Sequence, residues 1–359
     1  MFQVTMLPAD HGDCIWIEYG SANAPKHMLI DAGTAGTYKR LKAAIRERFG
    51  SGRAHFELFV ITHIDEDHIG GAVPLLEDEE VTFGDVWFNG WDQITENYPK
   101  DRLGEKQAEL VSDSIKRRKL PWNTPFGTTA DGNAKAVVIE EGPKTIAVGD
   151  LKLTLLSPYR EQLHALVPKW VKELKKAGLV DANGNLLRPA ERARRIRDAL
   201  GVPTINIAKL LAARFEPDAS EANGSSIAFL LEYKKTRALF TGDAHVPVLM
   251  QSLEKVSKAK RRIDLLKLPH HGSSGNISDK LLEMIECPRF LVSTSGARFK
   301  HPDLHALARI VGRKNANPEL IFNYESAFTK PWKSPTLQRK HGFTTVYPEQ
   351  KEGGCTVVL

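Results

Sequence analysis

The 359-residue sequence is poor in cysteine and contains no long hydrophobic run. Its three cysteines, Cys14, Cys287 and Cys355, are scattered and odd in number, which argues against a disulfide framework or a cysteine-based zinc knuckle. The apolar runs have the length of a strand and fall far short of the roughly 20 residues of a bilayer span. The amino terminus also lacks the basic segment and apolar stretch of a signal peptide. These absences predict a cytoplasmic protein without a transmembrane segment, in a reducing compartment.

Repeats and low-complexity tracts are also absent, and hydrophobic residues make up 42% and charged residues 26% of the chain. Such ordinary usage excludes fibrous and disordered classes, and the length favours one large domain with an insertion or two unequal domains. Fifty Lys and Arg against 44 Asp and Glu leave a net charge of +6. This mild excess suits phosphate-bearing substrates, and it equally fits an ordinary soluble protein.

Short apolar strands alternate with helical patterns in two parts of the chain, residues 1–84 and 222–359, which predicts an α/β sheet covered by helices. Residues 85–221 differ, because charged helical stretches there are broken by Gly, Pro and Asn. Within them, residues 160–199 hold ten Lys or Arg against five Asp or Glu. We therefore expect 1–84 and 222–359 to form one domain, with 85–221 as a helical, basic insertion that flanks the active site.

The most informative segment is V-I-T-H-I-D-E-D-H-I-G-G, residues 60–71. Four metal-capable side chains fall within six positions directly after an apolar strand: His63, Asp65, Asp67 and His68. Mixed imidazole and carboxylate ligands favour zinc, manganese or iron over calcium. Unpaired acidic groups beside a buried strand are also costly without a cation. The segment therefore predicts a metal site, in preference to a solvated acidic turn.

Two later segments carry similar chemistry at the ends of strands. Thr241-Gly242-Asp243 places a carboxylate after one strand, and Pro269-His270-His271-Gly272-Ser273 places paired imidazoles after another. Each signal is weak by itself, because a strand-terminal Gly-Asp is usually a turn. Together they fit an α/β sheet, whose ligands gather at the carboxyl ends of the strands.

The T-H-x-D-x-D-H-x-G-G motif, with L-I-D-A-G at 29–33, T-G-D-A at 241–244 and H-H-G-S at 270–273, resembles the metallo-β-lactamase superfamily. More narrowly, these motifs resemble the soluble hydrolase domain of ComEC-type DNA-uptake proteins and its stand-alone relatives. The resemblance covers residues 2–84 and 222 to the end. It implies an α/β fold, the four-layer αββα sandwich, here with a helical insertion, and a site for two divalent metal ions where the two sheets meet.

The resemblance also implies a ligand set. His63 and Asp65 would hold the first metal, Asp67 and His68 the second, and Asp243 would bridge the two. One of His270 and His271 would complete the second site. We favour His271, which leaves His270 as a packed neighbour, a hydrogen-bond donor behind a ligand or a catalytic group. Asp31, from L-I-D-A-G, is expected to orient a ligand histidine.

Two departures from the broad superfamily pattern alter the expected metal. The first motif commonly reads H-x-H-x-D-H, and here Asp65 replaces its second histidine. The third-motif histidine is absent, and Asn223-Gly224-Ser225-Ser226 stands in its place. The first site is therefore expected to be rich in oxygen, which shifts preference from zinc toward manganese or magnesium and weakens affinity. Two ions, manganese or zinc with magnesium as a further option, are still expected during turnover.

These expectations predict a metal-dependent hydrolase, and they favour a phosphodiesterase or nuclease that uses a metal-bound hydroxide. Asp67, His270 and His301 are the expected catalytic residues, with His301 as a proton donor to the leaving oxygen. The expected substrate contacts are Ser273, Ser274, Asn223 and Ser226. Lys267 is interpreted as a solvated or snorkelling strand residue, and the run Arg192, Arg194, Arg195 and Arg197 as a solvated helix flank or an edge that follows phosphates.

Two other functions stay open at this point. The first is a small-molecule hydrolase for a cyclic nucleotide, a phosphoester or a lactone, with the insertion as a closed lid. The second is a metal-stabilised interaction module without catalysis, part of a multi-gene system, whose protein partner binds the insertion. A ligand set with positions left for water favours an enzyme, because structural metal sites are usually closed and four-coordinate.

Overall fold

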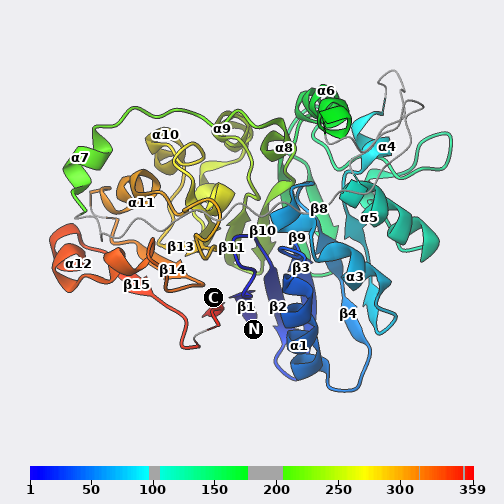
Figure 1. Ribbon diagram of the computed structural model, residues 1–359, viewed down its shortest axis with the longest axis horizontal. Coiled ribbons are helices and arrows are strands. Elements are labelled where there is room, and N and C mark those ends of the chain that lie inside the picture. The colour runs from blue at the N-terminus through cyan, green and yellow to red at the C-terminus, as the bar shows by residue number, and fades with distance from the viewer. Residues whose placement is uncertain (97–105, 177–204, 315, 351) are drawn as a thin grey trace.

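The computed structural model describes residues 1–96, 106–176, 205–314, 316–350 and 352–359 (Figure 1). Within these ranges, two large sheets form the centre of the molecule. The first contains six strands in the order β16-β1-β2-β3-β5-β7. They are Cys355–Val358, Phe2–Met6, Ile15–Ser21, Ala24–Ile30, Leu58–Val60 and Val86–Trp87. Strands β16, β1, β2 and β3 pair antiparallel, whereas β3, β5 and β7 run parallel.

The second sheet contains eight strands in the order β15-β14-β13-β12-β11-β10-β9-β8 among the described residues. They are Thr344–Val346, Glu319–Phe322, Arg289–Val292, Leu265–Lys267, Thr236–Phe240, Ala228–Tyr233, Leu151–Ser157 and Thr145–Val148. Strands β11 to β15 are parallel, and β8 to β11 are antiparallel. A separate parallel pair joins β4, Ala54–Phe56, to β6, Val81–Phe83.

Alternation of side chains along the strands divides the core into three layers. In β2, Ile15 and Ile17 join a cluster that also contains Phe229 and Leu231 of β10, so the two sheets pack face to face. The intervening Trp16 faces the opposite cluster. A strand reverses its side chains at every residue, so this pattern buries both faces of each sheet. Each fully buried aliphatic or aromatic side chain contributes about 1.5–3 kcal/mol.

Helices cover the outer face of each sheet, on opposite sides of the molecule (Figure 1). On the first sheet lie α1 to α6, which are Thr37–Phe49, Glu66–Ile69, Ala72–Glu77, Trp91–Ile94, Lys106–Arg117 and Arg160–Lys176. Toward the second lie α7 and α9 to α12, which are Ile207–Leu211, Val246–Lys255, Asp279–Glu283, Leu304–Val311 and Pro335–His341. The short α8, Glu221–Gly224, precedes β10. The αββα four-layer sandwich is thereby confirmed.

The expected boundaries of the insertion are wrong. Strands β7, β8 and β9 all fall between residues 85 and 221, yet β7 pairs with β5 and β9 pairs with β10 in the two central sheets. Residues 86–87 and 145–157 therefore belong to the sandwich, because their apolar side chains complete its inter-sheet core. The basic run Arg192, Arg194, Arg195 and Arg197 lies outside the described residues. No helix in the described ranges is both long and apolar enough to cross a membrane.

Candidate metal centre

Three chain segments meet at one edge of the sandwich, where the two sheets face each other. The first motif follows β5, Asp243 follows β11, and the histidine pair lies in a 3-10 turn, Pro269–Gly272, after β12. Backbone hydrogen bonds connect these segments, from Ile227 N–H to the Thr62 carbonyl at 2.8 Å and from His270 N–H to the Gly242 carbonyl at 3.1 Å. Gly242 has a φ of 49°, and a Cβ there would lie 3.0 Å from Cβ of Thr62. Glycine thus permits the close approach of the two loops.

One group of side chains at this edge has the dimensions of a single cation site. The Nε2 atoms of His68 and His271 are 3.2 Å apart, and His271 Nε2 is 3.3 Å from Asp67 Oδ2. His68 Nε2 lies 3.4 Å from Asp243 Oδ1. Ligands bound at about 2.1 Å around a tetrahedral ion are separated by roughly 3.4 Å. These spacings fit one divalent ion.

Hydrogen bonds behind the two imidazoles strengthen this fit. Nδ1 of His68 donates to Asp31 Oδ2 at 2.7 Å, and Nδ1 of His271 donates to the Ser293 carbonyl at 2.8 Å. In a neutral imidazole, a proton on Nδ1 leaves a lone pair on Nε2. The two buried Nε2 lone pairs therefore point at each other, an arrangement that requires a cation or an additional proton between them.

Buried carboxylates give this region a strong preference for positive charge. Burial alone would lower the pKa of His271, but nearby Asp13 and Asp243 raise it to about 9 in the metal-free protein. Burial alone would raise the pKa of Asp243, yet His68 and its neighbouring histidines hold it well below the usual range. Ionised carboxylates remain buried only when a cation or hydrogen bonds compensate them. The His/Asp cluster therefore fits a metal site.

A second group shares Asp243 and extends toward solvent. His63 Nε2 lies 3.7 Å from Asp65 Oδ2 and 3.9 Å from Asp243 Oδ2. Nε2 of His63 is buried and has no hydrogen-bond partner among the described residues. The Asp65 side chain is 42% exposed, so this group has an open side. An orphaned imidazole nitrogen beside two carboxylates is consistent with a second cation position.

Asp31 connects the two histidines of the first motif. Its Oδ1 accepts the Thr62 backbone N–H at 2.7 Å, and its Oδ2 accepts the Thr62 hydroxyl at 2.8 Å. The Thr62 oxygen then accepts Nδ1–H of His63 at 3.0 Å. Since Asp31 also holds His68, one buried carboxylate fixes the orientation of both rings. This geometry is the one expected of a residue that orients a ligand histidine.

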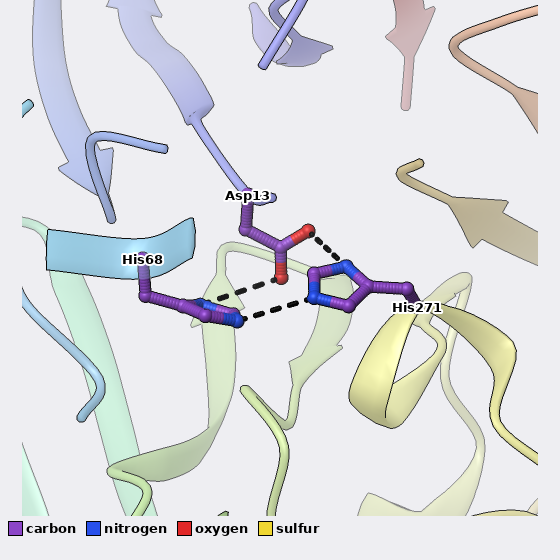
Figure 2. Close-up of side chains that lie close together, drawn as sticks. All are labelled: Asp13, His68 and His271. Atoms are coloured by element: carbon purple, nitrogen blue, oxygen red, sulfur yellow. Dashed lines mark hydrogen bonds and ion pairs between the residues drawn. The ribbon is translucent and has the colours of Figure 1, made fainter. Parts of the chain in front are cut away.

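Asp13, which the sequence interpretation missed, stands behind the same rings. Figure 2 shows its carboxylate between His68 and His271, at 3.9 Å from His68 Nδ1 and 3.3 Å from His271 Nδ1. Because it faces the Nδ1 side of each ring, it supports the histidines from behind. Only Cys14 separates Asp13 from the buried strand β2, so a carboxylate at the start of an apolar strand was the signal available in the sequence.

Lys267 is the partner of Asp13, and the expectation of a solvated lysine is wrong. Its side chain is 1% exposed and forms an ion pair with Asp13. Lys267 is the last residue of β12, where its neighbours Leu266 and Leu268 are also buried. A lysine within a strand buried on both faces requires a carboxylate partner. That requirement was the signal available in the sequence.

Asn223 and Ser226 are not placed to contact a substrate, which corrects that expectation. Both are buried, at 3% and 0% exposure. The Asn223 amide donates to Asp218 at 2.6 Å, and the Ser226 hydroxyl accepts the backbone N–H of Asp243 at 3.1 Å. They lie behind the site because α8 and the turn that follows it bring them under the β11 loop.

The remaining expected residues lie at the rim. Ser273 and Ser274 are partly exposed beside the histidine pair, and Ser278 is the residue that caps α10. His301 packs against His270 with ring centroids 5.3 Å apart, and its Nδ1 lies 3.2 Å from Asp303 Oδ1. The structure thus brings His301 beside the cluster.

Comparisons with known proteins give distant similarity only. No protein-family model and no curated protein matches the chain. Among solved structures, Zn²⁺-bound PqqB from Methylobacterium extorquens shares 11% identity at a TM-score of 0.41, over 99% of this chain and 100% of that one. A diphosphatase of the PhnP family shares 12% identity at a TM-score of 0.38, over 99% of this chain and 98% of that one. A CmlA β-hydroxylase mutant also matches, with 12% identity and a TM-score of 0.41, over 100% of this chain; the chain spans 54% of that protein. At these scores the likeness carries no functional conclusion.

Proposed function

We propose that this chain is a metal-dependent hydrolase of the metallo-β-lactamase superfamily that cleaves phosphodiester bonds, with nucleic acid as the favoured substrate. The observation that carries the proposal is the buried cluster in which two imidazole lone pairs and two ionised carboxylates converge. Its exposed side at Asp65 gives a substrate access to the cluster. The motif resemblance to the ComEC-type hydrolase domain agrees with this chemistry.

Two divalent ions, manganese or zinc with magnesium as a further option, are the proposed cofactors. His63, Asp65 and Asp243 would hold one, and Asp67, His68 and His271 would hold the other with Asp243 shared. When bound, divalent cations supply Lewis acidity toward a phosphoryl oxygen and lower the pKa of water. The protein contributes fixed ligand orientation through Asp31, Thr62 and Ser293.

His301 is the proposed proton donor to the leaving oxygen. Its Nδ1 is held by Asp303, whose other oxygen accepts the backbone N–H of Ser274 at 2.8 Å. An imidazole oriented by a carboxylate can carry and release a proton at Nε2. The contact between the His301 and His270 rings supports this role, because it brings the His301 imidazole next to the cluster.

The rim of the site offers contacts suited to a nucleotide chain. Arg298 is 56% exposed and pairs at 3.2 Å with Glu66, the residue between Asp65 and Asp67. Its guanidinium lies 5.1 Å from the ring centroid of Phe299, which is 43% exposed. A cation next to an exposed aromatic ring is the usual combination for phosphate contact and base stacking on single strands. These features favour nucleic acid within the phosphodiester class.

A substrate panel tests the proposal against its alternatives. Metal-loaded protein is incubated with single- and double-stranded DNA and RNA, a cyclic nucleotide, bis-p-nitrophenyl phosphate and a lactone. Cleavage of a polynucleotide supports a nuclease. Turnover of only the small esters or the lactone would instead identify a small-molecule hydrolase. Metal binding without any turnover would identify a non-catalytic module.

A further inference from the structure

The edge cluster contains four imidazoles, and the expected ligand set uses only three of them. The fourth is His270. Its Nε2 lies 3.8 Å from Asp243 Oδ2, and His63 Nε2 lies 3.9 Å from the same oxygen. The two nitrogens thus approach the open group at nearly equal distance from the shared carboxylate. His271 Nε2 is also 3.9 Å from this oxygen, but it lies nearer to Asp67 Oδ2 of the other group, at 3.3 Å.

The hydrogen-bond partners of His270 Nδ1 indicate which ring nitrogen carries the proton. Nδ1 lies 3.0 Å from Asn276 Oδ1 and 3.3 Å from Asp218 Oδ2. The Asn276 amide nitrogen donates to Asp218 and to the Asp243 carbonyl, so its Oδ1 must accept. The Asn223 amide nitrogen also lies 3.2 Å from Nδ1, but it donates to Asp218 at the shorter distance of 2.6 Å. With two acceptors and one donor around it, Nδ1 of His270 is assigned the proton, and Nε2 faces Asp243 with its lone pair.

The carboxylate behind His270 follows the same pattern as the one behind His68. Asp31 holds His68 from its Nδ1 side, and Asp218 holds His270 from its Nδ1 side. A carboxylate in this position is the common support of a metal-bound histidine. Asp218 is itself fixed by the Asn223 amide at 2.6 Å. Asn223 stands where the superfamily pattern expects its missing histidine, and here it supports another histidine.

The backbone at the histidine pair is shaped to separate the two rings. His270 has φ 48° and ψ 49°, and His271 has φ 54° and ψ 21°. Left-handed conformations are unfavourable for residues other than glycine. Two in succession direct the His270 ring toward Asp243 and the His271 ring toward Asp67. Strain of this kind gathers at functional sites.

We infer that His270 is a ligand of the first metal position, with His63, Asp65 and Asp243, and that it replaces the histidine absent at Asn223–Ser226. The first position then has two imidazoles and two carboxylates. This composition is less rich in oxygen than the sequence pattern indicates, and it restores the ability to bind zinc. The inference rests on the proposed function only in requiring that the cluster bind metal, since it makes no demand on the substrate.

Metal stoichiometry tests this assignment without an activity measurement. The protein is loaded with zinc, dialysed against metal-free buffer and analysed for bound zinc. We expect His270→Ala to reduce the content from about two ions to about one per chain, since the second group keeps its ligands. His301→Ala is the matched control, because it removes the neighbouring ring and leaves both groups intact. Equal zinc content in wild type and His270→Ala would overturn the inference.

Zinc-loaded wild-type protein gives an independent reading, which also serves if His270→Ala does not fold. Coordination shifts the ¹⁵N resonance of an imidazole nitrogen, so a long-range ¹H–¹⁵N spectrum reports which histidines bind. Coordinated Nε2 signals from His63, His68, His270 and His271 support the assignment. A free Nε2 signal for His270 overturns it. A protein with the full coordination and no phosphodiester cleavage would leave the assignment standing and refute the proposed function.

Discussion

Nε2 of His68 and Nε2 of His271 face each other across 3.2 Å, with both Nδ1 atoms committed to acceptors behind them. The two residues lie 203 positions apart in the chain, in α2 and after β12. Nothing in ordinary core packing favours two opposed lone pairs. An additional proton would relieve this repulsion, and a divalent cation would turn it into coordination, which is the basis of the chemistry proposed for the protein.

Loss of the Asp31 carboxylate should weaken metal binding without altering the ligands themselves. Asp31→Asn keeps the shape and tolerates the left-handed φ of 57° at this position. It removes the charge that holds His68 and, through Thr62, His63. We expect metal affinity to fall about 10–100-fold, as is usual when an outer carboxylate is lost. Competition with a coloured chelator measures this, with exposed Asp150→Asn as control. Unchanged affinity in Asp31→Asn would contradict the orienting role.

Because Asp13 and Lys267 form a buried ion pair, substitutions of the two residues should change the free energy of unfolding in a non-additive way. Lys267→Met leaves the Asp13 charge buried without its partner, which should lower the free energy of unfolding by about 3–5 kcal/mol. The double variant Asp13→Asn with Lys267→Met removes both charges and should recover part of that loss. Urea unfolding of the metal-free proteins measures all three values. Additive losses in the double variant would show that the two side chains act independently.

The lowered pKa of Asp303 predicts that the free energy of unfolding changes with pH in the acid range. Burial would raise its pKa, but His301 and the Ser274 backbone N–H lower it from 3.8 to about 2. A carboxyl whose folded pKa is lowered stabilises the protein above its unfolded pKa, and the contribution disappears as the pH falls toward 2. Asp303→Asn, which can still begin α11, should therefore cost about 1–2 kcal/mol at pH 7 after allowance for partial exposure.

Chemical unfolding of wild type and Asp303→Asn between pH 6 and pH 2 checks this sign. The difference in unfolding free energy should be constant above about pH 4 and shrink below it, as the wild-type carboxyl takes up its proton. For the exposed control Asp113→Asn, the difference in unfolding free energy from wild type should not shrink below about pH 4. A difference that grows as the pH falls would refute the hydrogen-bonded, ionised state of Asp303.

Arg298 predicts a change in substrate affinity that depends on salt. Arg298→Ala removes one cation at the rim while it leaves every proposed ligand in place. On a single-stranded oligonucleotide we expect KM to rise about 5–10-fold with kcat little changed, and the salt dependence to lose about one phosphate contact. Lys235→Ala, far along the chain on the turn between β10 and β11, is the control. A fall in kcat with constant KM would instead place Arg298 in the chemical step.

The sequence predicts the cluster well where its members follow strands. His63, Asp65, Asp67 and His68 lie in one segment that runs from the end of β5 into α2. Asp243 and His271 follow the neighbouring parallel strands β11 and β12, so their meeting follows from α/β architecture.

Other parts depend on contacts that a linear pattern does not encode. Asp13 and Lys267 lie far apart in the chain, and they meet only because the two sheets pack against each other. Asn223 is buried because of the direction of the short helix α8, to which it belongs. The orientation of His270 depends on two successive left-handed residues, a conformation that is uncommon for residues other than glycine and that the sequence pattern does not indicate.

The most direct test of the central claim is metal-dependent cleavage compared between wild type and Asp67→Asn. Both proteins are stripped with chelator, reconstituted with manganese, zinc or magnesium and incubated with an end-labelled oligonucleotide. We predict that cleavage by wild type returns with metal, and that Asp67→Asn remains at least about 100-fold slower with every metal although it stays folded. Equal cleavage by both proteins, or cleavage by stripped wild type, would contradict a metal-dependent hydrolase centred on this cluster.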